Sequence, residues 1–127
     1  MSSKAMSVEE NIAVARRWNE EGVNGRRFDL IDELFHPNYT QRSGMDGPWS
    51  IVVQGREAAK AGFSQFFQDH PEIKVVIDDI FGVGNKVVIR FSWYDDEGKF
   101  FGMSITIYRM VDGMILDDWV SATTVQT

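Results

Sequence analysis

The chain has 127 residues, of which 43% are hydrophobic and 25% charged, with a net charge of −6 and no cysteine. This composition predicts one globular domain, and the acidic balance argues against a nucleic-acid partner, which needs clustered Lys and Arg. The lack of cysteine excludes disulfides, thiolate zinc sites and cysteine nucleophiles, and no segment has the length and apolarity of a membrane span, so we expect a soluble cytoplasmic protein with no membrane partner.

Three helices are expected in the first 70 residues. Ser7 and Glu10 form a capping-box pattern ahead of a first helix at about 8–22. A second helix, at about 27–35, and a third, at about 56–69, are each stopped by a His-Pro pair, because the residue before a proline is disfavoured in helical geometry. Both later helices have aromatic residues at helical spacing.

The second half of the chain has the apolar period of two that is typical of strands. Four successive strands are expected, with the sequences "IKVVIDDIF", "KVVIRFSWY", "FFGMSITIYRM" and "MILDDWVSATT", and short hairpin signals separate them. Two further strand candidates, "NYTQR" and "SIVVQG", lie within residues 38–55. Helices followed by an antiparallel meander predict an α+β domain, with the helices across one face of a curved sheet.

Two neighbouring strands of this meander each have one strongly apolar face. The side chains that we expect to form a single apolar sheet face are Val87, Ile89, Phe91, Trp93, Phe101, Met103, Ile105 and Ile107. This face could pack under the helices while the mixed polar face meets water. Alternatively, the mixed face lines a cavity under the helices and the apolar face is a subunit interface. The second interpretation predicts a homodimer through the sheet face.

The stretch "DGMILDDWVSATT", residues 112–124, places two adjacent carboxylates in the last expected strand. Neighbouring side chains of a strand point to opposite faces, so we expect one of Asp117 and Asp118 to face a cavity and the other to lie outside it. A carboxylate enclosed by aromatic rings has its pKa raised by desolvation, which suits a general base near neutral pH. In the alternative interpretation, one aspartate is solvated and the other pairs with Arg90 or Arg109.

Several segments, in this order and spacing, resemble a known family. They are Trp18-Asn19, Leu34-Phe35-His36-Pro37 with Tyr39, Gly55-Arg56-Glu57, Pro71-Glu72, Gly84-Asn85-Lys86-Val87, Tyr108-Arg109, Asp112-Gly113-Met114-Ile115 and Asp117-Asp118-Trp119. Over about residues 8–120 the chain resembles the SnoaL-like polyketide cyclase group of the NTF2-like superfamily. The resemblance implies a cone in which three N-terminal helices pack on a curved antiparallel sheet and enclose a pocket, usually in a homodimer. This fold hosts cyclases, isomerases, epoxide hydrolases, dehydratases and inert binding modules.

The resemblance also implies candidate catalytic residues. The cyclases use a carboxylate in the frame Ile-x-acid-x-Trp, which selects Asp117 as the inward residue, whereas the hydrolase-like and isomerase-like frames select Asp118. The histidine partner of the cyclases would fall near Met103, and the chain has no histidine beyond residue 70. Epoxide hydrolases use an arginine between two aspartates, and Arg90 matches that arginine, but Ser92 stands where the first aspartate would be. We therefore choose Asp117.

These residues predict a small enzyme without a cofactor, a cyclase or isomerase that acts on an apolar, carbonyl-bearing molecule of polyketide- or terpenoid-like character. Asp117 or Asp118 would remove a proton alpha to the carbonyl, while Arg90 or Tyr39 stabilises the enolate. The expected substrate-binding side chains are Trp18, Phe63, Phe67, Met103 and Trp119.

Two alternatives stay open at this point. One is a dimeric module of the same fold that binds a hydrophobic ligand or assists assembly without catalysis, and the other is an epoxide-hydrolase-like enzyme. No metal is expected, because the chain has no cysteine and its two histidines, His36 and His70, lie far apart at helix ends.

Overall fold

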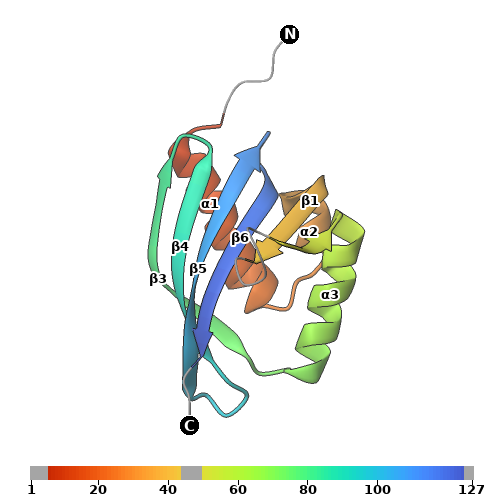
Figure 1. Ribbon diagram of the computed structural model, residues 1–127, viewed down its shortest axis with the longest axis vertical. Helices are drawn as coiled ribbons and strands as arrows, with labels where there is room; N and C mark the ends of the chain where they lie inside the picture. The colour runs from red at the N-terminus through yellow and green to blue at the C-terminus, as the bar shows by residue number, and fades with distance from the viewer. Residues whose placement is uncertain (1–5, 44–49, 125–127) are drawn as a thin grey trace.

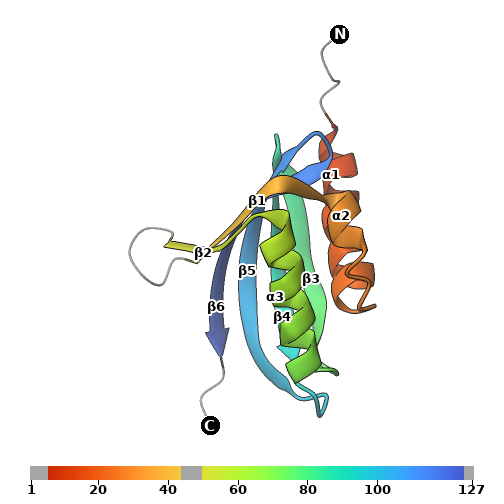
Figure 2. The same cartoon turned by 90° about the vertical axis from the view of Figure 1, so that its right-hand side faces the viewer.

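The computed structural model describes residues 6–43 and 50–124. Its elements, in chain order, are α1 (Val8–Arg17), the π-helix η1 (Trp18–Val23), α2 (Leu30–Leu34), β1 (Phe35–Ser43), β2 (Ser50–Gln54), α3 (Arg56–Asp69), β3 (Lys74–Val83), β4 (Lys86–Tyr94), β5 (Phe100–Val111) and β6 (Met114–Thr124). The sheet stands in front of α1 in Figure 1, and the turned view in Figure 2 shows its curvature, with the helices on one side. The predicted α+β class is confirmed.

The six strands form one open sheet in the order β2-β1-β6-β5-β4-β3. Strands β3 to β6 form the expected antiparallel meander, whereas β1 runs parallel to β6, so the sheet is antiparallel except at this one pair of the described strands. Strand β2 and helix α3 separate β1 from the meander in the chain, so no hairpin turn fixes the direction of β1 relative to β6. This pairing brings the first strand beside the last one.

The first helix begins at the predicted capping box. The backbone N–H of Glu10 donates to Ser7 Oγ, and the N–H of Ser7 donates to Glu10 Oε1, both at 3.1 Å. The helix then widens at Trp18 into a π-helix, where Asn24 N–H bonds to the Asn19 carbonyl at 3.1 Å, five residues back. The predicted single helix over 8–22 is therefore an α-helix followed by a π-helix.

Gly22 makes this wide turn possible. A Cβ added there would lie 2.1 Å from the ring of Trp18, so the indole packs directly against the glycine backbone. In this geometry two consecutive side chains, Trp18 and Asn19, are both buried. Trp18 contacts Phe35 and Phe63, with ring centroids 4.8 and 5.2 Å apart, and this aromatic cluster forms the core between the helices and the sheet.

We call the sheet face toward the helices the inner face and the opposite one the outer face. In β4 the inner side chains are Val87, Ile89, Phe91 and Trp93, whereas in β5 they are Gly102, Ser104, Thr106, Tyr108 and Met110. Met103, Ile105 and Ile107 of β5 therefore lie on the outer face, where Met103 and Ile105 are 37% and 46% exposed. The prediction that the apolar residues of both strands share one face is wrong.

A β-bulge explains this difference. Tyr94 pairs with Phe100, but Trp93 pairs with Gly102, so Phe101 is an extra residue in β5. One extra residue turns every later side chain of the strand to the other face. Without it, the apolar faces of β4 and β5 would have matched as the alternating pattern predicts.

Candidate active site

A second β-bulge decides which aspartate faces inward. Ile115 and Asp117 pair with two consecutive residues of β5, so Leu116 between them is the extra residue. As a result, Ile115 and Asp118 both lie on the inner face and Asp117 lies on the outer face. The prediction that Asp117 faces the cavity is wrong, because the Ile-x-acid-x-Trp frame on which it rests does not account for the extra residue Leu116.

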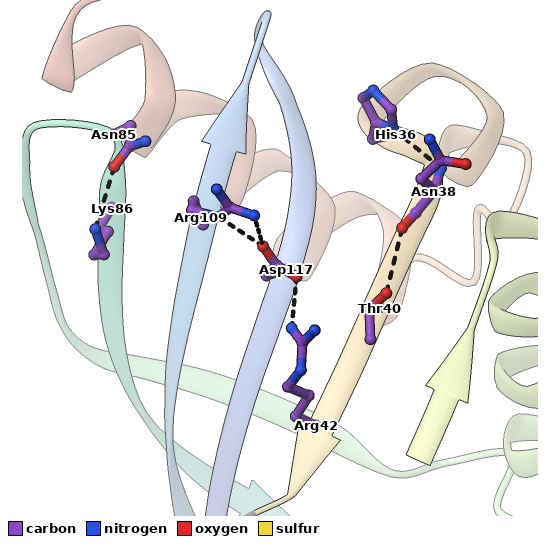
Figure 3. Close-up of polar contacts among 8 residues, drawn as sticks. All are labelled: His36, Asn38, Thr40, Arg42, Asn85, Lys86, Arg109 and Asp117. Atoms are coloured by element: carbon purple, nitrogen blue, oxygen red, sulfur yellow. Dashed lines mark hydrogen bonds and ion pairs between the residues drawn. The ribbon is translucent and has the colours of Figure 1, made fainter. Parts of the chain in front are cut away.

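Asp117 is held between two arginines on the outer face. Its Oδ1 accepts a hydrogen bond from Arg42 Nη1 at 2.6 Å. Its Oδ2 accepts one from Arg109 Nε at 2.6 Å and lies 2.5 Å from Arg109 Nη2 in the same ion pair. Figure 3 shows the carboxylate between the two guanidinium groups, which come from β1 and β5. Both oxygens are engaged in charge-assisted bonds to arginine side chains, so neither is directed at a substrate. Asp117 joins three strands.

Asp118 is enclosed on the inner face, with 5% of its surface exposed. Its Oδ2 accepts a hydrogen bond from the Tyr39 hydroxyl at 2.9 Å, while its Oδ1 has no hydrogen-bond partner within the described residues. Burial raises the pKa of Asp118 to about 7, and interactions with the side chains of Tyr39 and Gln41 oppose that rise. The carboxyl group therefore changes its charge near neutral pH, as a general base does.

A second tyrosine lies next to this carboxyl group. Tyr108 pairs with Asp118 across β5 and β6, and both side chains are on the inner face. Its hydroxyl oxygen accepts a hydrogen bond from Asn19 Nδ2 at 3.1 Å. Burial, followed by the charge of Asp118, raises the pKa of Tyr39 and of Tyr108 well above the usual value. Both phenols thus stay neutral and keep a proton to donate.

An apolar cavity of about 300 Å³ adjoins this group. It lies between α3 and strands β1, β2 and β4, and its lining residues are Tyr39, Gln41, Val53, Ala59, Gly62, Phe63, Phe66, Phe67 and Trp93. This volume is at the lower end of the range for small-molecule sites. The polar side chains on its wall are those of Tyr39 and Gln41, and Asp118 lies behind them. Through the Tyr39 hydroxyl, the wall is hydrogen-bonded to the buried carboxyl group.

The structure brings some of the expected site residues together. Tyr39, Phe63 and Phe67 line the cavity, and Trp18 packs behind Phe63 in the core, not on the cavity wall. Gln41 could have been predicted from the sequence, because it follows Tyr39 by two residues in the same strand and therefore shares its face.

Three other expected site residues, Arg90, Met103 and Trp119, lie on the outer face, away from the cavity. The Arg90 side chain donates from Nε to an Asp79 carboxylate oxygen at 2.7 Å, in an exposed ion pair. The ring of Trp119 lies 5.6 Å from the guanidinium of Arg42. Arg90 was expected to bind a substrate oxygen, and that prediction is wrong because its strand position faces outward. The epoxide-hydrolase alternative loses its arginine for the same reason.

The two histidines have local roles. His36 Nδ1 accepts a hydrogen bond from the backbone N–H of Asn38 at 3.0 Å (Figure 3), and His70 Nδ1 lies 3.5 Å from an Asp96 carboxylate oxygen. Within residues 6–43 and 50–124, no group of three or more His, Asp or Glu side chains is arranged to hold a metal ion. None of the helices in that same part of the chain is long and apolar enough to cross a membrane.

Solved structures with this fold share little sequence with the chain. A protein assigned as a SnoaL-like polyketide cyclase from Jannaschia sp. CCS1 is 17% identical with a TM-score of 0.76, and the match covers 96% of this chain and 91% of that one. An NTF2-like protein of unknown function from Mesorhizobium loti is also 17% identical with a TM-score of 0.76, covering 95% and 97%. A protein assigned as a ketosteroid isomerase from Kribbella flavida DSM 17836 is 14% identical with a TM-score of 0.75, covering 94% and 82%. These likenesses confirm the predicted NTF2-like fold.

The sequence comparisons agree with this fold. No curated protein matches the chain. The family profile described as SnoaL-like domain matches residues 15–117, which extend from the end of α1 through η1, the cavity-lining elements and most of the meander to Asp117. The match covers well over half of the chain, so the chain belongs to the SnoaL-like domain family.

Proposed function

We propose that this chain is a cofactor-free isomerase or cyclase that acts on an apolar, carbonyl-bearing small molecule of polyketide- or terpenoid-like character. The observation that carries the proposal is Asp118, which is buried beside an apolar cavity with its pKa raised to about 7. Among the described residues it has no ion-pair partner, so its charge is free to change during a reaction. A base with this pKa is partly ionised at neutral pH and still basic enough to take a proton.

In this mechanism the ionised Asp118 accepts the proton alpha to the substrate carbonyl at Oδ1, an oxygen whose second lone pair can still accept a hydrogen bond from the protein. The electron pair of the broken C–H bond forms a carbon–carbon double bond, and the π electron pair of the carbonyl moves onto its oxygen, which gives an enolate. The negative charge has then left Asp118, so the Tyr39 hydroxyl can turn its hydrogen bond from the carboxyl group to the enolate oxygen. Return of the proton to another carbon gives isomerisation, and attack of the enolate carbon on a second carbonyl gives cyclisation.

The position of Asp118 behind the cavity wall sets one requirement. Tyr39 and Gln41 lie between the cavity and the carboxyl group, so the side chain of Gln41 must move aside when a substrate binds. The same position supports a second function, a module that binds an apolar ligand without catalysis. In that case the ligand contacts the cavity wall alone, and Asp118 never meets it.

Proton exchange separates these functions without knowledge of the natural substrate. The probe is 2-tetralone, a bicyclic apolar ketone whose alpha protons exchange with D₂O and can be followed by ¹H NMR. We expect the wild-type protein to accelerate this exchange and Asp118→Asn to reduce the acceleration by about 10²–10⁴-fold, the usual contribution of a general base. Binding of 2-tetralone without accelerated exchange would instead establish the binding module.

Asp117→Asn is the matched control. It changes the neighbouring carboxylate in the same way, but on the outer face, where Arg42 and Arg109 hold it. We expect this variant to keep its exchange rate within about threefold of wild type while it loses stability, because two arginines lose their partner. Equal losses of exchange in both variants would contradict the assignment of the base to Asp118.

A further inference from the structure

Beyond the base itself, we propose that Asn19 and Tyr108 form a positioning pair that donates a second hydrogen bond to Asp118 when this carboxyl group is ionised. Asn19 orients the hydroxyl of Tyr108, and Tyr108 offers its proton to Oδ1. This inference rests on the proposed function for its catalytic meaning, since the second bond holds the base in its reactive form. The contacts that lead to it do not depend on any substrate.

The direction of the Asn19–Tyr108 hydrogen bond is fixed by counting donors. The amide nitrogen of Asn19 has two hydrogens. It donates to the backbone carbonyl of Ala15 at 2.9 Å and to the hydroxyl oxygen of Tyr108 at 3.1 Å. The Tyr108 oxygen therefore accepts in this contact, and its own proton is left to point elsewhere. Buried hydroxyl groups normally find an acceptor for that proton.

The unpartnered acceptor beside Tyr108 is Oδ1 of Asp118. The two residues are opposite each other in the register of β5 and β6, and both lie on the inner face. Tyr39 already gives its proton to Oδ2, so Oδ1 is the oxygen without a partner among the described residues. The charge of Asp118 also raises the pKa of Tyr108, which places the two groups within electrostatic reach.

The π-helix supplies the position of Asn19. Its wide turn buries Trp18 and Asn19 together, and Gly22 provides the room that the indole needs. π-helical turns are rare and often occur at functional sites. Here the π-helical turn positions the side-chain amide of Asn19 next to β5. There it donates a hydrogen bond to the hydroxyl of Tyr108, a residue 89 positions later in the chain.

The charge state of Asp118 is sensitive to few neighbours. The titratable groups that face it are Tyr39 from β1 and Tyr108 from β5, and both are neutral phenols. The inner-face residues of α3 and β4 in contact with this region, such as Phe63 and Trp93, carry no charge. Gln41 and Asn19 are uncharged amides. A change in the titration of Asp118 therefore reports on these hydrogen bonds.

The test is a ¹³C NMR titration of the Asp118 carboxyl group without any substrate. Tyr39→Phe removes a hydrogen bond that is already present and serves as the matched reference. We expect it to raise the pKa of Asp118 by about 1–2 units, the value of one hydrogen bond to a charged group. We expect Tyr108→Phe to raise the pKa by a similar amount, and Asn19→Ala to raise it less. An unchanged pKa in well-folded Tyr108→Phe would overturn the proposal.

A second measurement covers the case in which these variants fold poorly. The chain has three tyrosines, so 3-fluorotyrosine can replace all of them with almost no change in size. In a Tyr39→Phe background, the fluorinated tyrosines are Tyr94, on the outer face, and Tyr108. A fluorinated phenol is a stronger donor, so the pKa of Asp118 should fall relative to the unlabelled background. No fall would overturn the proposal. If the wild-type protein does not accelerate the exchange of 2-tetralone but the variants still shift the pKa of Asp118 as expected, the proposed function is rejected and the positioning pair is retained.

Discussion

At neutral pH the ionised carboxyl group of Asp118 lowers the stability of the fold that encloses it. Burial raises its pKa from an ordinary value of 3.8 to about 7, so the folded state favours the protonated form. The stabilisation that comes from the protonated Asp118 is fully present below the pKa that this carboxyl group has in the unfolded chain. It is lost as the pH rises through the pKa of the same group in the folded protein. The window of loss runs from about pH 4 to pH 7, and the loss amounts to about 4 kcal/mol.

Asp118→Asn should remove this pH dependence. The amide is close in shape and carries no charge at any pH, so we expect the variant and the wild type to be similarly stable near pH 4. At pH 8 the variant should be the more stable protein. Urea denaturation at both pH values measures the difference, and parallel stability curves over this range would contradict an enclosed, titrating carboxyl group.

Some residues of the candidate site could be predicted from the sequence, because their spacing along one helix or strand is enough to fix the face on which they lie. Phe63 and Phe67 follow from helical spacing, and Tyr39 follows from the resemblance of its segment to the family. Asn19 and Tyr108 are quoted in that resemblance, but no role follows from it, because their contact depends on the π-helix and on strand register. Which aspartate lies inside depends on one extra residue, Leu116, and the alternating pattern does not reveal it.

At the scale of whole elements, the helix and strand positions were accessible from the sequence, but the orientation of two strands was not. The helix at Arg56–Asp69 and the four strands of the meander lie where the apolar periods predict them. The bulges at Phe101 and Leu116 each insert a single residue, and each reverses the faces that follow it. A bulge has no apolar period of its own, so a pattern-based prediction passes over it.

The π-helix at Trp18–Val23 allows a direct test with two glycines. A Cβ at Gly22 would collide with the Trp18 ring at 2.1 Å, whereas a Cβ at Gly62 in α3 meets no atom within 4 Å. We therefore expect Gly22→Ala to lower the free energy of unfolding by about 1–3 kcal/mol, the usual effect of overpacking. The same change at Gly62 should raise it by about 0.5–1 kcal/mol, because alanine is the better helix former. Urea denaturation compares the two, and equal effects would contradict the close packing of Gly22.

At the scale of the whole molecule, the outer face of the sheet exposes several large apolar side chains to solvent. Its exposed apolar side chains include Val76, Phe81, Val83, Phe100, Met103 and Ile105, between 37% and 74% exposed. Large apolar patches of this kind are typical of interaction sites. We propose that a second copy of the chain covers this face. The residues differ from those first expected, because Val87, Ile89 and Phe91 are buried under the helices.

Sedimentation equilibrium at micromolar concentration tests the dimer. We expect about twice the chain mass of 14.5 kDa for the wild type. Ile105→Lys places a charge in the middle of the outer face and should give a monomer, whereas Gln68→Lys, on the exposed side of α3, should leave the dimer intact. A wild-type protein that sediments as a monomer would rule out this role for the outer face.

The parallel pairing of β1 with β6 has a consequence for the synthesis of the protein. Tyr39 and Asp118 are 79 residues apart in the chain, and they meet only when β6 has docked between β1 and β5. A nascent chain that has emerged only as far as β5 has all the helices and most of the cavity wall but lacks Asp118, and it leaves one edge of β1 and one edge of β5 unpaired. Such contacts between distant segments form slowly. The Tyr39–Asp118 hydrogen bond is therefore formed by the same step that closes the gap between β1 and β5, so these two inner strand edges are already paired when the proposed base meets its tyrosine.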